Sequence, residues 1–161
     1  MSLSNYASPI GNLELEADDR ELVAIRIGAT ARSRAASPLH PVLDAAARAL
    51  DAYFGKRFAR VTLPFAWHRV PPFHRTVLET LWLRIPAGET LSYKRLAELS
   101  GSPRAFRAVG TAMARNPWPI LVPCHRVLAS HGIGGFGPGV GTKRILLAHE
   151  ATAVSTLHHQ P

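Results

Sequence analysis

The sequence predicts an α+β fold, in which a small N-terminal antiparallel sheet with a helix precedes a mostly helical, winged-helix-like C-terminal domain carrying a helix-turn-helix. Apolar residues alternate along the first part, whereas from Pro72 onward they recur at helical spacing. Positive charge is also concentrated in the second part. We therefore expect an N-terminal α/β domain over residues 1–68, a C-terminal domain over 69–150 and a tail over 151–161.

The first part is expected to form short strands and then one helix. Apolar residues alternate over 13–17 and again over 23–27, with a Pro-Ile-Gly turn and an acidic turn between the runs, which is typical of an antiparallel meander. Residues 60–66 are expected to add an edge strand. One helical face would carry Leu39, Val42, Leu43, Ala46, Ala47, Leu50, Tyr53 and Phe54, and Gly55 stands where a left-handed glycine would end that helix.

The second part is expected to contain four helices. An apolar stripe over residues 73–82 ends before Pro86, and a short helix follows with Ser92 as its N-cap. Ser102 is expected to cap the next helix, with Pro103 at its first position. A last helix is expected from Thr142 to Glu150.

The third of these helices has one apolar and one basic side. Ala105, Phe106, Val109, Ala112 and Met113 fall on one side, and Arg104, Arg107, Thr111 and Arg115 fall on the other. Two short helices joined by a Ser-Gly-Ser turn, the second with an arginine stripe, resemble a helix-turn-helix. An ordinary surface helix with solvated arginines is the alternative.

Charge and cysteine content narrow the functional class. Residues 1–66 hold eight Lys or Arg against seven Asp or Glu, while residues 67–161 hold eleven against four, so the second part would attract a polyanion. The chain has no apolar run of about 18 residues and no signal-peptide pattern at its start, so we expect a soluble, cytoplasmic protein. A single cysteine allows neither an internal disulfide nor a thiolate-rich zinc site. We predict no metal and no cofactor.

That cysteine, Cys124, lies in the segment NPWPILVPCHRVL and is followed by His125. A catalytic thiol needs an activating base, but neighbouring side chains of an extended segment point to opposite faces, so contact requires a turn or a bridging water. Glu150, the only acidic residue after the cysteine, is a candidate for orienting the imidazole. From the Cys-His pair alone, a small buried thiol without chemistry remains the alternative.

The longer segment AFRAVGTAMARNPWPILVPCHRV resembles the O6-alkylguanine-DNA alkyltransferase family, also called methylated-DNA–protein-cysteine methyltransferases. The resemblance continues in SPIGNLELEADD, LDAYFGKR, FHRTVLETLWLRIPAGETLSYKRLA and KRILLAHE. It implies a protein that binds duplex DNA in the minor groove, flips an alkylated guanine into a pocket and moves the alkyl group to cysteine sulfur. O4-alkylthymine is a second candidate substrate. Because a thioether is stable, such a protein would react once.

The resemblance also assigns roles to individual residues. Cys124 would be the acceptor, His125 the base acting through water, Glu150 the group orienting His125, and Asn116 the hinge beneath the active-site turn. Tyr93, Val127, Pro119, Phe136 and Gly137 would contact the substrate. Arg107 would fill the gap left by the flipped base, and Arg104, Thr111, Arg115 and Arg126 would contact DNA.

Some positions depart from the family pattern. Phe136 stands where a tyrosine is common and Gly137 where a small side chain is common, both within the glycine-rich loop GIGGFGPGVG. This loop is about one residue short. Trp118 and His74 replace residues that are usually smaller or glutamine. Some members hold a zinc ion on cysteines of the first domain, and this chain offers none there.

Two other functions compete with alkyl transfer. The first is a non-catalytic sensor of alkylated DNA, or a winged-helix regulator, in which the cysteine is silent; the related non-enzymatic branch carries tryptophan at the position of Cys124, so the cysteine favours transfer. The second is a cysteine hydrolase, which the basic second part does not favour. The expected partner is double-stranded DNA containing alkylated guanine. We expect a monomer, with cooperative binding along DNA left open, in the cytoplasm or, in a eukaryote, the nucleus.

Overall fold

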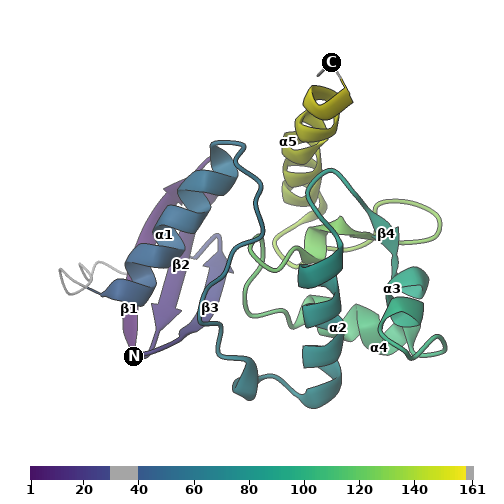
Figure 1. The fold of residues 1–161 in the computed structure, drawn as a ribbon, viewed down its shortest axis with the longest axis horizontal. Coiled ribbons are helices and arrows are strands. Elements are labelled where there is room, and N and C mark those ends of the chain that lie inside the picture. Colours follow the sequence, from purple (N-terminus) through teal and green to yellow (C-terminus); the bar gives the residue numbers. More distant parts are fainter. Residues whose placement is uncertain (30–39, 159–161) are drawn as a thin grey trace.

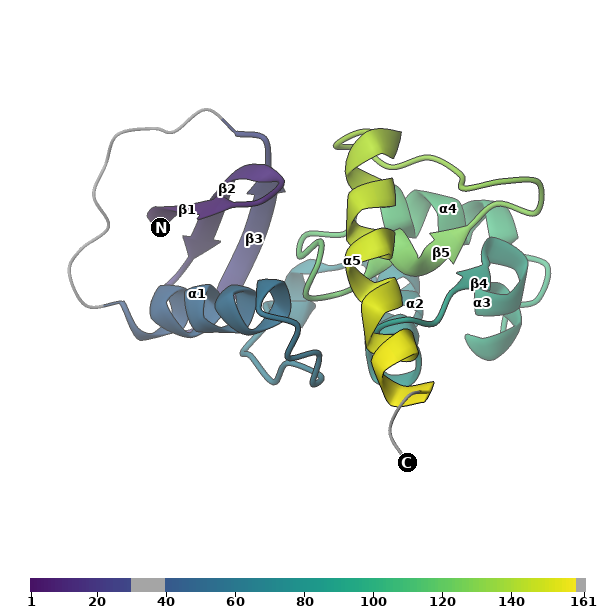
Figure 2. The ribbon, with the colours of Figure 1, turned by 90° about the horizontal axis from the view of Figure 1, so that it is seen from above.

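The computed structural model describes residues 1–29 and 40–158, which form two parts lying side by side (Figures 1 and 2). The first part holds a three-stranded antiparallel sheet of order β1-β2-β3, formed by β1 (Ser2–Ser8), β2 (Gly11–Ala17) and β3 (Leu22–Ile27). Helix α1 (Pro41–Phe54) covers one face of this sheet (Figure 1). The predicted meander and helix are therefore confirmed.

Alternation along β2 explains how sheet and helix meet. Leu13, Leu15 and Ala17 are buried, as are Val42, Leu43, Ala46, Leu50 and Tyr53 of α1. The expected role of Gly55 was wrong, because Gly55 has φ −82° and the left-handed conformation falls to Lys56, with φ 61°. Leu39, expected on the same helical face, lies outside the described residues.

Residues 60–66 do not form the expected edge strand. They contribute one isolated bridge, between Phe65 and Leu22, and the Leu22 N–H donates to the Pro64 carbonyl at 2.8 Å. Proline has no N–H to donate, so Pro64 interrupts any longer ladder. A short 3-10 turn, η1 (Trp67–Arg69), then leads into the second part.

The second part contains α2 (Pro72–Arg84), α3 (Tyr93–Leu99), α4 (Phe106–Ala114) and α5 (Val140–His158). Two short strands, β4 (Leu91–Ser92) and β5 (Val127–Leu128), pair in parallel, and the 3-10 turn η2 (Cys124–Arg126) precedes β5. Helix α5 starts before Thr142 and continues past Glu150, so residues 151–158, expected as a tail, are helical. Residues 159–161 lie outside the described part.

The start of α4 also differs from the expectation. Helix α4 begins at Phe106, after Ala105, which supplies no side-chain cap, so Ser102 is not its N-cap. The N–H of Ser102 instead donates to the Ala97 carbonyl at 2.9 Å and closes the end of α3, where Gly101 has φ 83°. Residues 100–105, which include Pro103, therefore form the turn of the helix-turn-helix.

An aromatic cluster joins the two parts. Trp118 is fully buried, and its ring centroid lies 5.1 Å from that of Phe65 and 4.9 Å from that of Trp67. The cluster gives the parts a common core and limits their relative movement. None of the helices in the described ranges is long and apolar enough to cross a membrane.

Candidate active site around Cys124

The turn before Cys124 is held by one side chain. Asn116 accepts a hydrogen bond from the Trp118 N–H at 3.0 Å through Oδ1 and donates to the Val122 carbonyl at 2.7 Å through Nδ2. Between these contacts Ile120 has φ 76°, a conformation that is strained for a β-branched residue. The surrounding fold therefore fixes the path of the chain into Cys124.

Strand β3 supports the same turn from the first part. The Ile25 N–H donates to the Pro117 carbonyl at 2.8 Å, and Trp118 Nε1 donates to the Leu22 carbonyl at 2.9 Å. Both bonds tie the turn to the sheet. The N-terminal part is thus a scaffold for the segment that carries the thiol.

A buried polar network follows Cys124. His125 Nε2 is hydrogen-bonded to Glu150 Oε2, and Arg126 Nε donates to Glu150 Oε1 at 2.7 Å. The Tyr53 hydroxyl, from α1, donates to Glu150 Oε2 at 2.5 Å. Burial on its own would raise the pKa of Glu150, but the hydrogen bonds and charges of His125 and Arg126 lower it to about 2. Glu150 is thus a buried carboxylate with three donors.

The other ring nitrogen of His125 is free to act. At neutral pH the ring is neutral, because burial and the nearby charges of Arg126 and Lys143 lower the pKa of His125 more than Glu150 raises it. Since Nε2–H donates to the carboxylate, the lone pair lies on Nδ1. Nδ1 is buried and has no hydrogen-bond partner in the structure. A buried basic nitrogen without a donor is suited to take a proton.

The thiol itself is only 6 % exposed. Burial raises the pKa of Cys124, while a hydrogen bond from Asn116 and the positive charge of Lys143 act in the opposite direction. The thiol is therefore protonated at neutral pH until a base removes its proton.

A cavity of about 200 Å³ opens onto the sulfur. Its lining is formed by Tyr93, Gly110, Met113, Ala114, Cys124, Gly135, Phe136 and Gly137. Tyr93 reaches this cavity because β4, which precedes it, pairs with β5, the strand that follows η2 and its cysteine. Ligand pockets usually measure about 300–1,000 Å³, so this cavity is small and has room for one compact group only. Pro119 and Val127 are not among its lining residues.

Lys143 connects the glycine-rich loop to this site. Its side chain is fully buried, and Nζ donates to the Val127 carbonyl at 2.7 Å and to the Gly135 carbonyl at 3.1 Å. One ammonium group thus holds β5 and the loop over the cavity together. The Val127 carbonyl that Lys143 holds belongs to a residue that the resemblance assigned to substrate contact.

Known proteins match the chain over nearly its full length. A family described as 6-O-methylguanine DNA methyltransferase, ribonuclease-like domain, matches residues 1–67, and one described as 6-O-methylguanine DNA methyltransferase, DNA binding domain, matches residues 72–152. The human methylated-DNA--protein-cysteine methyltransferase is 38 % identical over 93 % of this chain and 80 % of its own, and that of Cricetulus griseus is 40 % identical over 93 % and 82 %. The crystal structure of Mycobacterium tuberculosis OGT in complex with DNA has a TM-score of 0.79 and 35 % identity, covering 92 % of this chain and 91 % of that one.

The chain belongs to the 6-O-methylguanine DNA methyltransferase family. The family boundary between residues 67 and 72 falls close to the end of η1.

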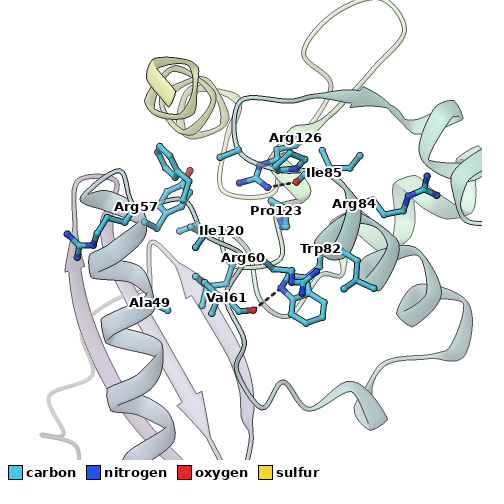
Figure 3. Close-up of a pocket in the computed structure, with 17 residues that line it drawn as sticks. Ala49, Arg57, Arg60, Val61, Trp82, Arg84, Ile85, Ile120, Pro123 and Arg126 are labelled. Carbon is cyan, nitrogen blue, oxygen red and sulfur yellow. Dashed lines mark hydrogen bonds between the residues drawn. The ribbon is translucent and has the colours of Figure 1, made fainter. Parts of the chain in front are cut away.

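The residues expected to contact DNA do not all lie on one surface. Arg107, Thr111 and Arg115 are exposed on or just after α4, and Arg104 is exposed just before it. The assignment of Arg126 was wrong, because its side chain is buried, holds Glu150 and donates to the Ile85 carbonyl at 2.6 Å (Figure 3). Arg126 is thus part of the active-site network.

The positions that depart from the family pattern fall into two groups, those at the cavity and those away from it. Phe136 and Gly137 line the cavity, where they can set its width. Trp118 belongs to the aromatic cluster, and His74 lies against Phe73 at the start of α2, with ring centroids 6.4 Å apart. Trp118 and His74 are not among the residues that line this cavity.

A cavity of about 340 Å³, larger than the one at Cys124, lies between the two parts and borders Pro123 (Figure 3). Pro123 and Arg126 contribute to its lining, together with Ile120, Val61 and Trp82. Cys124 does not line it, so this cavity is not the site of thiol chemistry.

Sequence reasoning missed two members of the site. Tyr53 was assigned only to an apolar helix face, and its hydroxyl contacts a residue 97 positions away, which no local pattern indicates. Lys143 follows the glycine-rich loop and looks like an ordinary solvated lysine. A lysine placed directly after a loop of six glycines, within the first turn of a helix, was the only available signal.

Proposed function

We propose that this protein repairs DNA by moving an alkyl group from O6-alkylguanine to the sulfur of Cys124 in a single irreversible turnover. One observation carries the proposal: a buried thiol borders a small cavity and is followed directly by a neutral histidine. Glu150 holds Nε2 of this histidine, and its Nδ1 has no hydrogen-bond partner in the structure. Family membership supports it.

The chemistry begins with removal of the thiol proton. A water molecule between Sγ and Nδ1 would accept the proton from sulfur and donate one to His125, whose positive charge Glu150 would then balance. Tyr53 and Arg126 hold this carboxylate, so it stays ionised and oriented. The resulting thiolate receives further stabilisation from Asn116 and Lys143.

The transfer step exchanges one bond for another. The thiolate attacks the alkyl carbon, a carbon–sulfur bond forms, the carbon–O6 bond breaks, and its electron pair stays on guanine. The purine ring takes up that charge, and a hydrogen bond from Tyr93, which lines the cavity, stabilises it. Guanine then gains a proton, which the His125 imidazolium can return through water, so the histidine is neutral again. A thioether is a stable product, so each chain reacts once.

The substrate would be presented by duplex DNA bound along α4. The exposed arginines around α4 supply positive charge, and Arg107 would enter the duplex in place of the flipped nucleotide. Flipping costs a few kcal/mol, which these contacts offset in part. We infer that the protein acts as a monomer at the genome, in the cytoplasm of a prokaryote or the nucleus of a eukaryote, and that O4-alkylthymine is a second substrate.

The decisive experiment is intact mass analysis after incubation with a duplex that contains one O6-methylguanine. We expect a gain of one methyl group in the wild type and no gain in Cys124→Ala. Lesion-specific binding without a mass gain in the wild type would contradict transfer and leave the damage sensor as the function.

A further inference from the structure

Phe106 stands out on α4 because it is an exposed aromatic side chain next to the expected intercalating arginine. On the helical wheel Phe106 falls with the apolar residues of α4, yet it is 46 % exposed, whereas Val109 and Met113 on later turns are buried. At about 100° per residue, Gly110 lies roughly 40° from Phe106 and 60° from Arg107. Gly110, which lines the cavity at Cys124, therefore lies between the two side chains on the helix surface.

A second hollow lies beside Phe106. This open groove of about 430 Å³ is lined by Tyr93, Lys94, Phe106, Gly110, Ala129 and Ser130. It shares Tyr93 and Gly110 with the cavity at Cys124, so the two are direct neighbours. Sites that bind single-stranded nucleic acid combine an aromatic surface for the base with a positive charge for the phosphate. In this groove Phe106 can supply the surface and Lys94 the charge.

We propose that this groove is a second nucleobase subsite, in which Phe106 stacks on the base next to the lesion on the same strand. The inference rests on the proposed alkyl transfer from DNA. A base flipped into the cavity loses contact with its neighbour in the stack. Because Tyr93 borders both the cavity and the groove, that neighbouring base would lie beside the groove. Phe106 would replace the lost stacking partner, and Lys94 would contact the adjoining phosphate.

The first test uses fluorescence in a complex that cannot react. Cys124→Ala, with and without Phe106→Ala, is bound to duplexes carrying O6-methylguanine and the fluorescent base 2-aminopurine on the 5′ flank, the 3′ flank or the opposite strand. Stacking quenches 2-aminopurine. We expect brighter emission from one flank probe when Phe106 is truncated, and restored quenching with Phe106→Trp. Unchanged emission at both flanks, or a change confined to the opposite strand, would overturn the subsite.

The second test compares single-turnover rates at subsaturating protein in the reactive chain. Phe106→Ala should slow reaction with lesion-containing duplex by about tenfold, the effect of losing one base–aromatic stack. Reaction with free O6-benzylguanine should be unchanged. Leu83→Ala, which truncates a similarly exposed apolar side chain on α2, should leave both rates unchanged.

The outcomes separate the subsite from the proposed function. Equal losses with duplex and free base would show that Phe106 supports the cavity and would refute the subsite. If the wild type transferred no alkyl group from either substrate, the proposed function would fail, while the fluorescence of the unreactive complex would still decide on the subsite.

Discussion

The hydroxyl of Tyr53 offers a sharp test of the coupling between the two parts of the chain, because Tyr53→Phe removes one oxygen atom and leaves the ring. That oxygen donates to Glu150 Oε2 at 2.5 Å within a buried network. The ring packs edge-on against Phe54 and Phe58, and these contacts should persist.

A matched control exists in the same part of the chain. The Tyr6 hydroxyl donates to Asp51 Oδ1, also at 2.5 Å, but this pair is exposed to solvent. A hydrogen bond to a charged group contributes about 1.5–3 kcal/mol when water does not compete, whereas exposed pairs contribute about 0–1 kcal/mol. We therefore expect Tyr53→Phe to lower the free energy of unfolding by about 2 kcal/mol and Tyr6→Phe by well under 1 kcal/mol.

Urea unfolding at pH 7, with both variants measured beside the wild type, checks these values. For a chain of this size the Tyr53→Phe loss corresponds to a fall in Tm of about 4–8 °C. Equal effects of the two substitutions would refute the reasoning, since burial of the Glu150 network would then contribute nothing to its strength.

Three further predictions concern the site. Lys143→Met should raise the pKa of the Cys124 thiol, because it removes the nearby positive charge. The pH dependence of thiol alkylation by iodoacetamide measures this pKa. A lower pKa, or an equal rise in the variant of the exposed neighbour, Arg144→Met, would contradict the prediction. The pKa of Glu150 is about 2 in the fold against a usual 4.5, so its stabilisation, about 3 kcal/mol, is complete above pH 4.5 and is lost as the pH falls toward 2. Unfolding free energies measured down to pH 3 should therefore decline less steeply in Glu150→Gln, and parallel curves would be the opposing result. Gly137→Ala should leave the fold intact, because an added Cβ meets no atom within 4 Å. It should narrow the cavity and slow the reaction with O6-benzylguanine several-fold more than the reaction with methylated DNA. An unchanged ratio of the two single-turnover rates would argue against this prediction.

Regular spacing made most of the fold predictable. Alternation at Leu13, Leu15 and Ala17 marked β2 correctly, and Ser92 capped α3 as expected, with its hydroxyl oxygen accepting from the Arg95 N–H at 3.0 Å. Errors arose at the helix ends. Ser102 was expected to cap the helix that became α4, but α4 begins only at Phe106, and Ser102 lies in the turn before it.

The resemblance named several residues that the structure brings together, among them His125 with Glu150 and, at the cavity, Tyr93, Phe136 and Gly137. It did not indicate the other groups that hold Glu150. Arg126 was expected to contact DNA, yet its side chain is buried and bound to Glu150, the only acidic residue after Cys124. Phe106 fits the apolar periodicity of α4, yet at the first turn of this helix its side chain is exposed. Such outcomes depend on which distant groups the fold brings together, so spacing alone could not provide them.

The most direct test of the account is a stoichiometric titration of the protein with excess lesion-containing duplex, followed by peptide mapping. We predict that repair stops at one alkyl group per chain and that this group lies on the peptide containing Cys124. Continued turnover, or an alkyl group on any other residue, would contradict the central claim.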